Sequence, residues 1–313
     1  MKNAFQQLRT EIGTVILGQS SVVEALLVAL LAEGHVILEG VPGTAKTLLV
    51  KLFSTLIQGE FRRVQLTPDV LPADVLGTSI FDLASQQFIL RKGPIFTQIL
   101  LADEINRTPP KTQAALLEAM EERQVTLDGE TLPLSPLFWT IATQNPLEFE
   151  GTYPLPEAQL DRFLFKMVVD YPNAAAEKQM LANILGGFEP HNLSQWTGRP
   201  ILDGDRILAA RQEVRSIHVE DSILDYLLNL VTGSRSQPEL LLGASPRAAV
   251  GWLRAAQAKA WLDDRTFVTP DDIKGIALPL LRHRFILKPE AQLDGISVDR
   301  VIRNLLSRIP VPR

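Results

Sequence analysis

The sequence has no cysteine among its 313 residues. This absence excludes disulfide bonds, zinc sites built from thiolates and cysteine nucleophiles. Histidine is also scarce, and its positions show no H-x-x-x-H spacing, so we expect no dedicated histidine metal site. The four histidines are His35, His191, His218 and His283.

Long apolar runs are missing as well. The longest apolar stretch, around Ala25–Ala32, is shorter than the roughly 18 residues needed to cross a bilayer. The first residues also lack the apolar core and cleavage site of a signal peptide. We therefore expect no membrane insertion and a cytoplasmic location. The net charge of −5 argues against a general grip on nucleic acid, so nucleic acid is not an expected partner.

What is present is typical of a globular protein, with 46% apolar and 21% charged residues. Up to about Pro172, short apolar runs alternate with helical patterns, and beyond it helical patterns continue with no obvious strand. This order predicts an α/β fold, a mostly parallel sheet with helices on both faces, followed by a smaller all-helical domain. A boundary near residues 172–190 gives a core of residues 1–180 and a second domain of residues 181–313.

The chain is organised around an eight-residue string between an expected strand, His35–Glu39, and an expected helix, Leu48–Phe53. The string reads Gly40, Val41, Pro42, Gly43, Thr44, Ala45, Lys46 and Thr47. A glycine-containing loop that ends in a lysine and a hydroxyl residue, between strand and helix, is typical of a phosphate-binding P-loop. Its N–H groups would surround the phosphates, Lys46 would place its charge on the β and γ phosphates, and Thr47 would offer its hydroxyl to Mg²⁺.

Ala45 departs from the usual G-x-x-x-x-G-K-[ST] pattern, because it stands where the last glycine belongs. Alanine is the smallest side chain after glycine, so we expect the loop to form with slightly less room. The competing interpretation is a plain Gly-Pro turn before a helix, with Lys46 merely solvated. The downstream motifs decide between the two.

Two carboxylates, Asp103 and Glu104, directly follow another apolar strand, which we expect at Ile95–Ala102. A carboxylate at the carboxyl end of a central strand lies beside the P-loop in this class of sheet. Asp103 would hold Mg²⁺, and Glu104 would act as the general base for the attacking water. Asn145 follows the expected strand Phe138–Thr143, and its amide would hold that water or a γ-phosphate oxygen. Taken alone, the two carboxylates also fit an acidic helix cap at a strand end, and Asn145 fits an ordinary turn before proline.

Two segments outside the expected sheet read as hairpins. Leu71–Phe96 contains short alternating runs bounded by turn residues, and Gln124–Leu134 has Asp128-Gly129 at its centre. In an isolated hairpin, aromatic residues such as Phe81 and Phe88 are more often packing residues.

Helix starts are marked by hydroxyl residues before proline. Thr108 is expected to cap a helix whose first residue is Pro109, and Ser245 to cap one whose first residue is Pro246. Beyond Pro172, six patterns predict helices, and one of them covers Thr269–Leu281.

These motifs together resemble those of the AAA+ ATPases, and their detailed sequences resemble those of the MoxR family. They are Gly40–Gly43, Ala102–Arg107, Ala142–Pro146, Leu155–Phe163 and Gly243–Arg247, spread across most of the chain. Alanine at position 45 also resembles that family. The resemblance implies ATP as the nucleotide, Mg²⁺ as cofactor and a homo-oligomeric ring, expected to be a hexamer, with ATP sites between subunits.

The resemblance also carries roles to matching positions. Arg162 stands where the family has its arginine finger, which reaches the γ-phosphate bound by the neighbouring subunit; the alternative is a salt bridge with a nearby carboxylate, Asp161 or Glu157. Arg247 resembles the sensor 2 arginine, acting either in cis or across the interface. The adenine-contacting turn of the family is matched by Ile16, Gly18 and Gln19.

The function that follows is Mg²⁺-dependent ATP hydrolysis driving chaperone-like remodelling or maturation of protein clients. The resemblance implies a separate partner protein with a von Willebrand factor A domain. Two rival functions are a nucleotide-gated binding module with little turnover and a DNA-directed motor. The intact set of Asp103, Glu104, Asn145 and Arg162 argues against the first rival, and the acidic net charge argues against the second.

Overall fold

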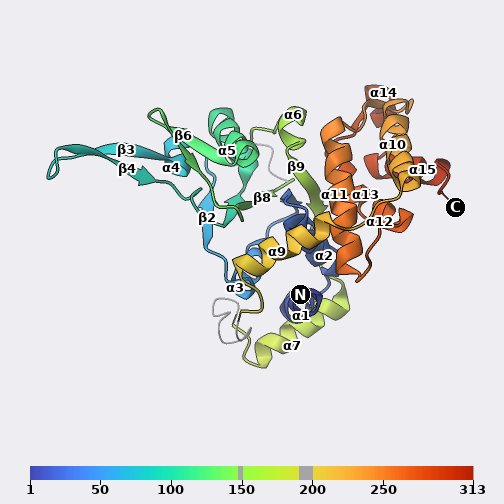
Figure 1. Ribbon diagram of the computed structural model, residues 1–313, viewed down its shortest axis with the longest axis horizontal. Helices are drawn as coiled ribbons and strands as arrows, with labels where there is room; N and C mark the ends of the chain where they lie inside the picture. Colours follow the sequence, from blue (N-terminus) through green and yellow to red (C-terminus); the bar gives the residue numbers. More distant parts are fainter. Residues whose placement is uncertain (147–150, 190–199, 313) are drawn as a thin grey trace.

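The computed structural model describes residues 1–146, 151–189 and 200–312. Its core is a five-stranded parallel sheet in the order β2-β5-β8-β1-β9 (Figure 1). The strands are β1 (His35–Glu39), β2 (Phe61–Gln65), β5 (Ile99–Asp103), β8 (Trp139–Gln144) and β9 (Phe163–Val168). This sheet confirms the predicted α/β fold.

Helices cover both faces of the sheet because the central strands are apolar on both. Leu38 and Leu101 point to one face and pack in a cluster with the N-terminal and P-loop helices. Ile37 and Leu100, one residue earlier in each strand, point to the other face and pack with α5. The helices are α1 (Lys2–Val15), α2 (Ser20–Leu31), α3 (Lys46–Leu56) and α5 (Pro110–Glu122).

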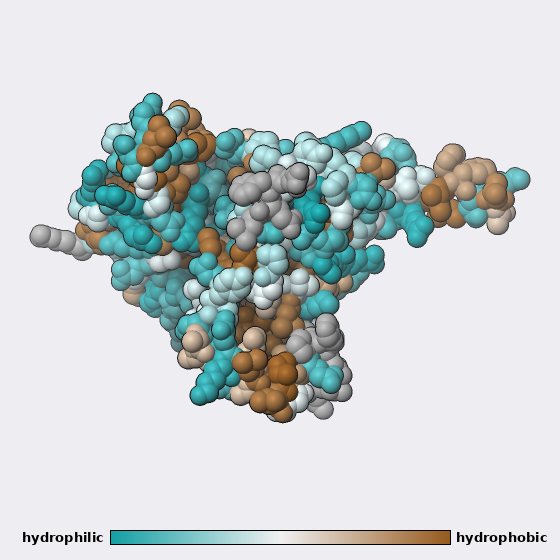
Figure 2. All heavy atoms as spheres, turned by 180° about the vertical axis from the view of Figure 1, so that it is seen from behind, coloured by the Kyte–Doolittle hydropathy of each residue, from teal (hydrophilic) through white to brown (hydrophobic). Residues whose placement is uncertain are grey.

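Both predicted hairpins are confirmed. They are β3 (Gly77–Asp82) with β4 (Gln87–Lys92), and β6 (Gln124–Leu127) with β7 (Glu130–Pro133); a short helix, α4 (Pro72–Leu76), precedes the first and was not predicted. The β3–β4 hairpin projects far from the core (Figure 1). Its outer end is apolar (Figure 2), with Leu83 84% and Phe88 74% exposed.

The chain around and after β9 is mainly helical. The helices are α6 (Glu157–Leu160), α7 (Ala174–Leu185), α9 (Gly204–Arg215), α10 (Asp221–Arg235), α11 (Pro246–Leu262), α12 (Pro270–Gly275), α13 (Ala277–Leu281), α14 (Pro289–Leu293) and α15 (Val298–Arg308). Within the described ranges, none of the helices is long and apolar enough to cross a membrane.

The expectation of no strand beyond Pro172 is wrong. β10 (Leu240–Leu242) pairs antiparallel with β11 (Ile286–Leu287) and adds a small sheet to the helical second part. Strands of two and three residues are too short to leave an alternating pattern in the sequence. Only the packing of segments more than 40 residues apart brings them together.

Two helix boundaries differ from the predictions. A 3₁₀ turn, η1 (Ile105–Arg107), follows β5, and α5 begins at Pro110 with Pro109 at its N-cap, so the expected Thr108 cap is wrong by one residue. Pro109 has ψ of 151°, an extended value that keeps it outside the helix. The helix expected at Thr269–Leu281 divides at Ile276, whose φ of −102° and ψ of 0° separate α12 from α13.

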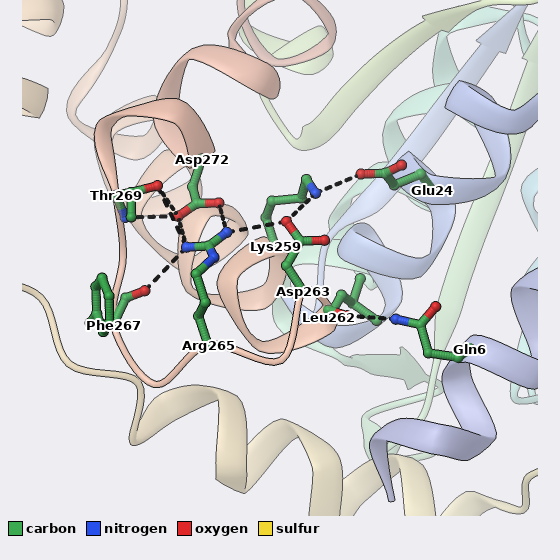
Figure 3. Close-up of polar contacts among 9 residues, drawn as sticks. All are labelled: Gln6, Glu24, Lys259, Leu262, Asp263, Arg265, Phe267, Thr269 and Asp272. Carbon is green, nitrogen blue, oxygen red and sulfur yellow. Dashed lines mark hydrogen bonds and ion pairs between the residues drawn. The ribbon is translucent and has the colours of Figure 1, made fainter.

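Polar contacts fasten α11 to the N-terminal helices (Figure 3). Lys259 Nζ lies 2.8 Å from a carboxylate oxygen of Glu24 on α2, and Gln6 Nε2 on α1 donates to the carbonyl of Leu262 at 2.8 Å. One hydrophobic cluster also runs through α1, α2 and α11. The division into residues 1–180 and 181–313 therefore stays a prediction.

His35, the first residue of β1, is a buried histidine that the fold keeps neutral. Burial lowers its pKa from 6.5 to about 4. The Thr140 N–H donates to Nδ1 at 2.9 Å, which leaves the ring proton on Nε2, 3.3 Å from the Met120 carbonyl. The unfolded chain takes up this proton near pH 6.5 and the folded chain only near pH 4, so stability is lost as the pH falls through that window. We expect this group to lower the free energy of unfolding by about 2 kcal/mol between pH 7 and pH 5.

Urea unfolding at the two pH values measures this loss, and His35→Gln should show a smaller loss than the parent. His218→Gln is the matched control, because the side chain of His218 is 63% exposed. The control should keep the pH dependence of the parent. An undiminished loss in His35→Gln would contradict the prediction.

Candidate functional site

The P-loop joins β1 to α3 and folds around its own lysine. Lys46 Nζ donates to the carbonyls of Gly40 and Val41, at 2.7 Å each, and to Thr44 Oγ1 at 3.1 Å. Burial lowers the pKa of Lys46, and the negative charges of Asp103 and Glu104 oppose that shift. The ammonium group thus lies within electrostatic reach of both the loop and the carboxylates.

Two positions of this loop, Ala45 and Gly40, are constrained in different ways. Ala45 has φ of 60° and ψ of 20°, the left-handed region that favours glycine, and its side chain is exposed. The methyl group therefore costs backbone strain, about 1 kcal/mol, rather than space. Gly40 is different, because a Cβ there would lie 2.4 Å from the carbonyl oxygen of Val169. Close packing against the end of β9 thus requires glycine at position 40.

Asp103, the last residue of β5, is only 7% exposed and is held on both carboxylate oxygens. Oδ1 accepts a hydrogen bond from Thr143 Oγ1 at 2.5 Å. Oδ2 accepts from Nε and Nη2 of Arg63 on the edge strand β2, at 2.9 and 2.7 Å. Charge-assisted bonds of this kind fix the orientation of a carboxylate.

A strained backbone and several hydrogen bonds set the orientation of the Glu104 side chain. Its φ of 59° and ψ of 52° are left-handed, and its N–H donates to Thr143 Oγ1 at 2.8 Å. Its Oε2 accepts from Gln65 Nε2 at 2.9 Å and from Arg107 Nη1 at 3.0 Å. Backbone strain held in place by surrounding contacts is a frequent property of functional residues.

The residues predicted to act on the phosphates meet at the carboxyl edge of the sheet. β1, β5 and β8 are parallel, and each ends there. The N–H of Gly40 donates to the carbonyl of Gln144 at 3.2 Å, which joins the P-loop to the end of β8. Asn145 follows and is 7% exposed, and its backbone carbonyl accepts from Asn106 Nδ2 at 3.5 Å. The sheet thus collects the P-loop, both carboxylates and this asparagine.

The turn predicted to contact adenine lies between α1 and α2. Ile16 is buried, Gly18 has φ of +77°, and Gln19 Nε2 donates to the carbonyl of Asp170 at 2.7 Å. A Cβ at Gly18 would lie 3.2 Å from side-chain atoms of Pro172 and Ala176. The turn therefore lies against the segment that leads from β9 into α7, and its adenine contact stays a prediction.

The donor set fits Mg²⁺ bound together with phosphates. In the part of the chain that the structure describes, no group of three histidine or carboxylate side chains could hold a metal ion by itself. Mg²⁺ keeps several waters and takes one or two protein oxygens beside the phosphates of its substrate. The fixed carboxylate of Asp103 and the hydroxyl of Thr47, in the first turn of α3, are such oxygens.

The two predicted arginines lie at the opposite end of the strands, where β1 and β9 begin. Arg162 directly precedes β9, whose first residue, Phe163, pairs with His35 at the start of β1. Arg247 lies in the first turn of α11, and the start of this helix confirms the predicted Ser245 cap. Ser245 Oγ accepts from the N–H of Ala248 at 3.0 Å.

Glu121, near the end of α5, brings the two arginines together. Arg162 Nε lies 2.7 Å from Glu121 Oε2, and Arg247 Nη2 forms an ion pair with Oε1 of the same carboxylate. The alternative salt bridge of Arg162 with Asp161 is not formed, because the Asp161 carboxylate is bound by Arg284 at 2.7 Å and by Ser245.

Family models and named relatives match the chain. The model described as ATPase family associated with various cellular activities (AAA) matches residues 35–165, and the AAA lid domain model matches residues 232–305. The chain is 41% identical to Chaperone MoxR1 of Mycobacterium tuberculosis, covering 97% of this chain and 81% of that protein. It is 30% identical to Protein MoxR of Paracoccus denitrificans, covering 98% and 96%. This chain belongs to the MoxR family of AAA+ ATPases.

Two further similarities extend over nearly the whole chain. An uncharacterised protein of Bacillus subtilis, YeaC, is 45% identical over 96% of this chain and 92% of its own length. A crystal structure of a protein designated an ATPase from Cytophaga hutchinsonii has a TM-score of 0.91 at 38% identity, covering 100% of this chain and 96% of that one. The fold of this chain thus matches that ATPase structure along its whole length.

The sequence alone did not reveal the residues that bind and orient the predicted site residues of this MoxR-family chain. Arg63, Gln65 and Glu121 belong to none of the sequence motifs. One signal was available for the first two, because positions i and i+2 of a strand share a face. β2 lies directly beside the strand that ends in the predicted carboxylates. For Glu121 no local pattern existed, since its partners are 41 and 126 residues away in sequence.

Proposed function

We propose that this protein hydrolyses ATP with Mg²⁺ at sites shared between neighbouring subunits of a ring. The observation that carries the proposal is that two half-sites lie on opposite edges of one sheet. The P-loop follows the carboxyl end of β1, whereas Arg162 precedes the amino end of β9, its parallel neighbour. Five residues of β1, about 16 Å at 3.3 Å per residue, separate these edges. A second subunit is therefore the natural source of the arginines for each γ-phosphate.

The residues at the carboxyl edge divide the work on ATP. The P-loop N–H groups and Lys46 bind the β and γ phosphates, since the N–H groups of Lys46 exchange loop carbonyls for phosphate oxygens. Thr47 and Asp103 would hold Mg²⁺, which would neutralise charge on those phosphates. Glu104 takes the proton of the attacking water, and Asn145 orients that water or a γ-phosphate oxygen.

The arginines complete the site from the neighbouring subunit. A guanidinium presents a planar set of N–H donors that suits phosphate oxygens, and a finger of this kind contributes a factor of about 10³–10⁵ to turnover. We assign Arg162 this role. Arg247 acts with it across the interface rather than in cis, since both side chains share Glu121.

Contacts between unlike surfaces repeat from copy to copy and close into a ring when the rotation allows it. We propose a homo-oligomeric ring of six subunits, the number implied by the family resemblance. A ring places every P-loop beside the arginines of the next copy, so all sites are equivalent.

The work done with ATP is, in our proposal, chaperone-like remodelling or maturation of protein clients. The name of the relative Chaperone MoxR1 supports it. The projecting β3–β4 hairpin supplies an apolar surface for a client, with Phe81 50% and Phe88 74% exposed. A partner with a von Willebrand factor A domain would be a separate chain. The cytoplasmic location stays a prediction.

The purified chain is expected to hydrolyse ATP only with Mg²⁺, with turnover per subunit rising as protein concentration drives ring assembly. Phosphate release measures turnover, and native mass spectrometry counts the subunits. A monomer with full turnover would contradict the shared site. Strong stimulation by duplex or single-stranded DNA would favour the DNA-directed motor, and ATP binding without turnover by assembled rings would favour the nucleotide-gated module.

A further inference from the structure

Glu121 occupies an unusual place between two cations. Its two oxygens serve different arginines, one from the segment before β9 and one from α11. The side chains are only partly covered, with 31% of Glu121, 28% of Arg162 and 46% of Arg247 exposed. Partly exposed ion pairs of this kind contribute little stability, so they separate at small cost.

The surroundings of Glu121 form a cavity of about 440 Å³ with an excess of positive charge. Its lining includes five arginines and three carboxylates. Two of the other arginines have their own partners, since Arg284 binds Asp161 and Arg123 binds Glu33. Glu121 is therefore the carboxylate that balances the arginine pair.

The pair keeps donors in reserve. Arg162 reaches Glu121 through Nε, yet this buried N–H lacks an aligned hydrogen-bond acceptor. Arg247 reaches Glu121 through Nη2. Each guanidinium has five N–H donors, and each contacts Glu121 through only one of its nitrogens. An incoming group with several oxygens and more negative charge, such as a terminal phosphate, would satisfy these donors better than one carboxylate does.

We propose that Glu121 is an internal counter-ion that holds Arg162 and Arg247 side by side and releases them to the γ-phosphate of the neighbouring subunit. Glu121 thus competes with that phosphate and sets how tightly each shared site binds ATP. The inference rests on the proposed function, because it takes both arginines as the trans half of the site.

The test measures equilibrium binding of a fluorescent ATP analogue to assembled rings, with Mg²⁺ present. All proteins carry Glu104→Gln, which keeps the nucleotide from being consumed. We expect Glu121→Gln to tighten binding about five-fold, roughly 1 kcal/mol, because the arginines lose their competing charge. Glu121→Asp keeps the charge and should bind like the parent. Glu118→Gln, an equal charge change at an exposed position on the same helix, should also bind like the parent.

A second set of proteins adds Arg162→Ala and Arg247→Ala. Without the arginines there is nothing for Glu121 to occupy, so Glu121→Gln should no longer change the affinity. An equal effect with and without the arginines, or no effect of Glu121→Gln in the parent, would overturn the proposal. Removal of the arginines separates this failure from failure of the proposed function. If the shared site itself is wrong, Arg162→Ala and Arg247→Ala will leave ATP affinity and turnover unchanged, whatever Glu121 does.

Discussion

Glu104→Gln is expected to leave ATP binding intact and to lower turnover at least about a hundred-fold. The carboxylate is the proton acceptor for water in our proposal, and an amide has no comparable basicity. The shape of the site should persist, because an amide oxygen still accepts from Gln65 and Arg107 as Oε2 does now. The left-handed backbone at this position is also held by the bond from its N–H to Thr143.

Phosphate release and equilibrium ATP binding, measured on the same preparation, check this prediction. Glu118→Gln is the control, since it makes the same chemical change at an exposed position of α5. Turnover of Glu104→Gln at the parent rate would remove Glu104 from the role of general base. Loss of binding together with turnover would instead assign it to holding the nucleotide.

Mixing two inactive proteins, Lys46→Ala and Arg162→Ala, is expected to restore about a quarter of the parent turnover. Each variant alone lacks one half of every site, and an arginine finger is worth a factor of about 10³–10⁵. In a randomly mixed ring, an interface is intact when the P-loop comes from the Arg162→Ala chain and the finger from the Lys46→Ala chain. With equal amounts and repeating head-to-tail contacts, about one interface in four meets that condition.

The control mixes Arg162→Ala with the double variant Lys46→Ala/Arg162→Ala, in which every interface lacks a finger and turnover should stay absent. Native mass spectrometry of differently tagged chains shows whether mixed rings have formed. Absence of recovery in demonstrated mixed rings would exclude an arginine that acts between subunits.

The positions of the predicted site residues could be found from the sequence, whereas the residues that orient them could not. The P-loop, Asp103 and Asn145 were predictable because each depends on a short string next to one buried strand. Parallel strands then place such strings at one edge by geometry alone. The supports of these residues were not predictable. Arg63 contacts a carboxylate 40 residues away, and the strand face that it shares with Gln65 does not identify that carboxylate as its partner.

The fold shows the same division. Central strands such as β5 have five buried residues in a row, a pattern strong enough to find without any partner. The strands β10 and β11 have three and two residues, and they form only because helices on either side bring them into register. Ala45 was visible as a departure from the P-loop pattern, but its left-handed backbone was not.

The sequence by itself determined the class of protein and the loop and strand ends at which we propose that the chemistry occurs, because local strings and strand burial carry that information. The tertiary structure alone decided how those side chains are grouped. It placed Arg247 beside Arg162 on one carboxylate, at the edge of the sheet opposite the P-loop. The physical reason is that an ion pair between α5, α11 and the segment before β9 depends on the packing of the whole lid against the core, which no local pattern encodes.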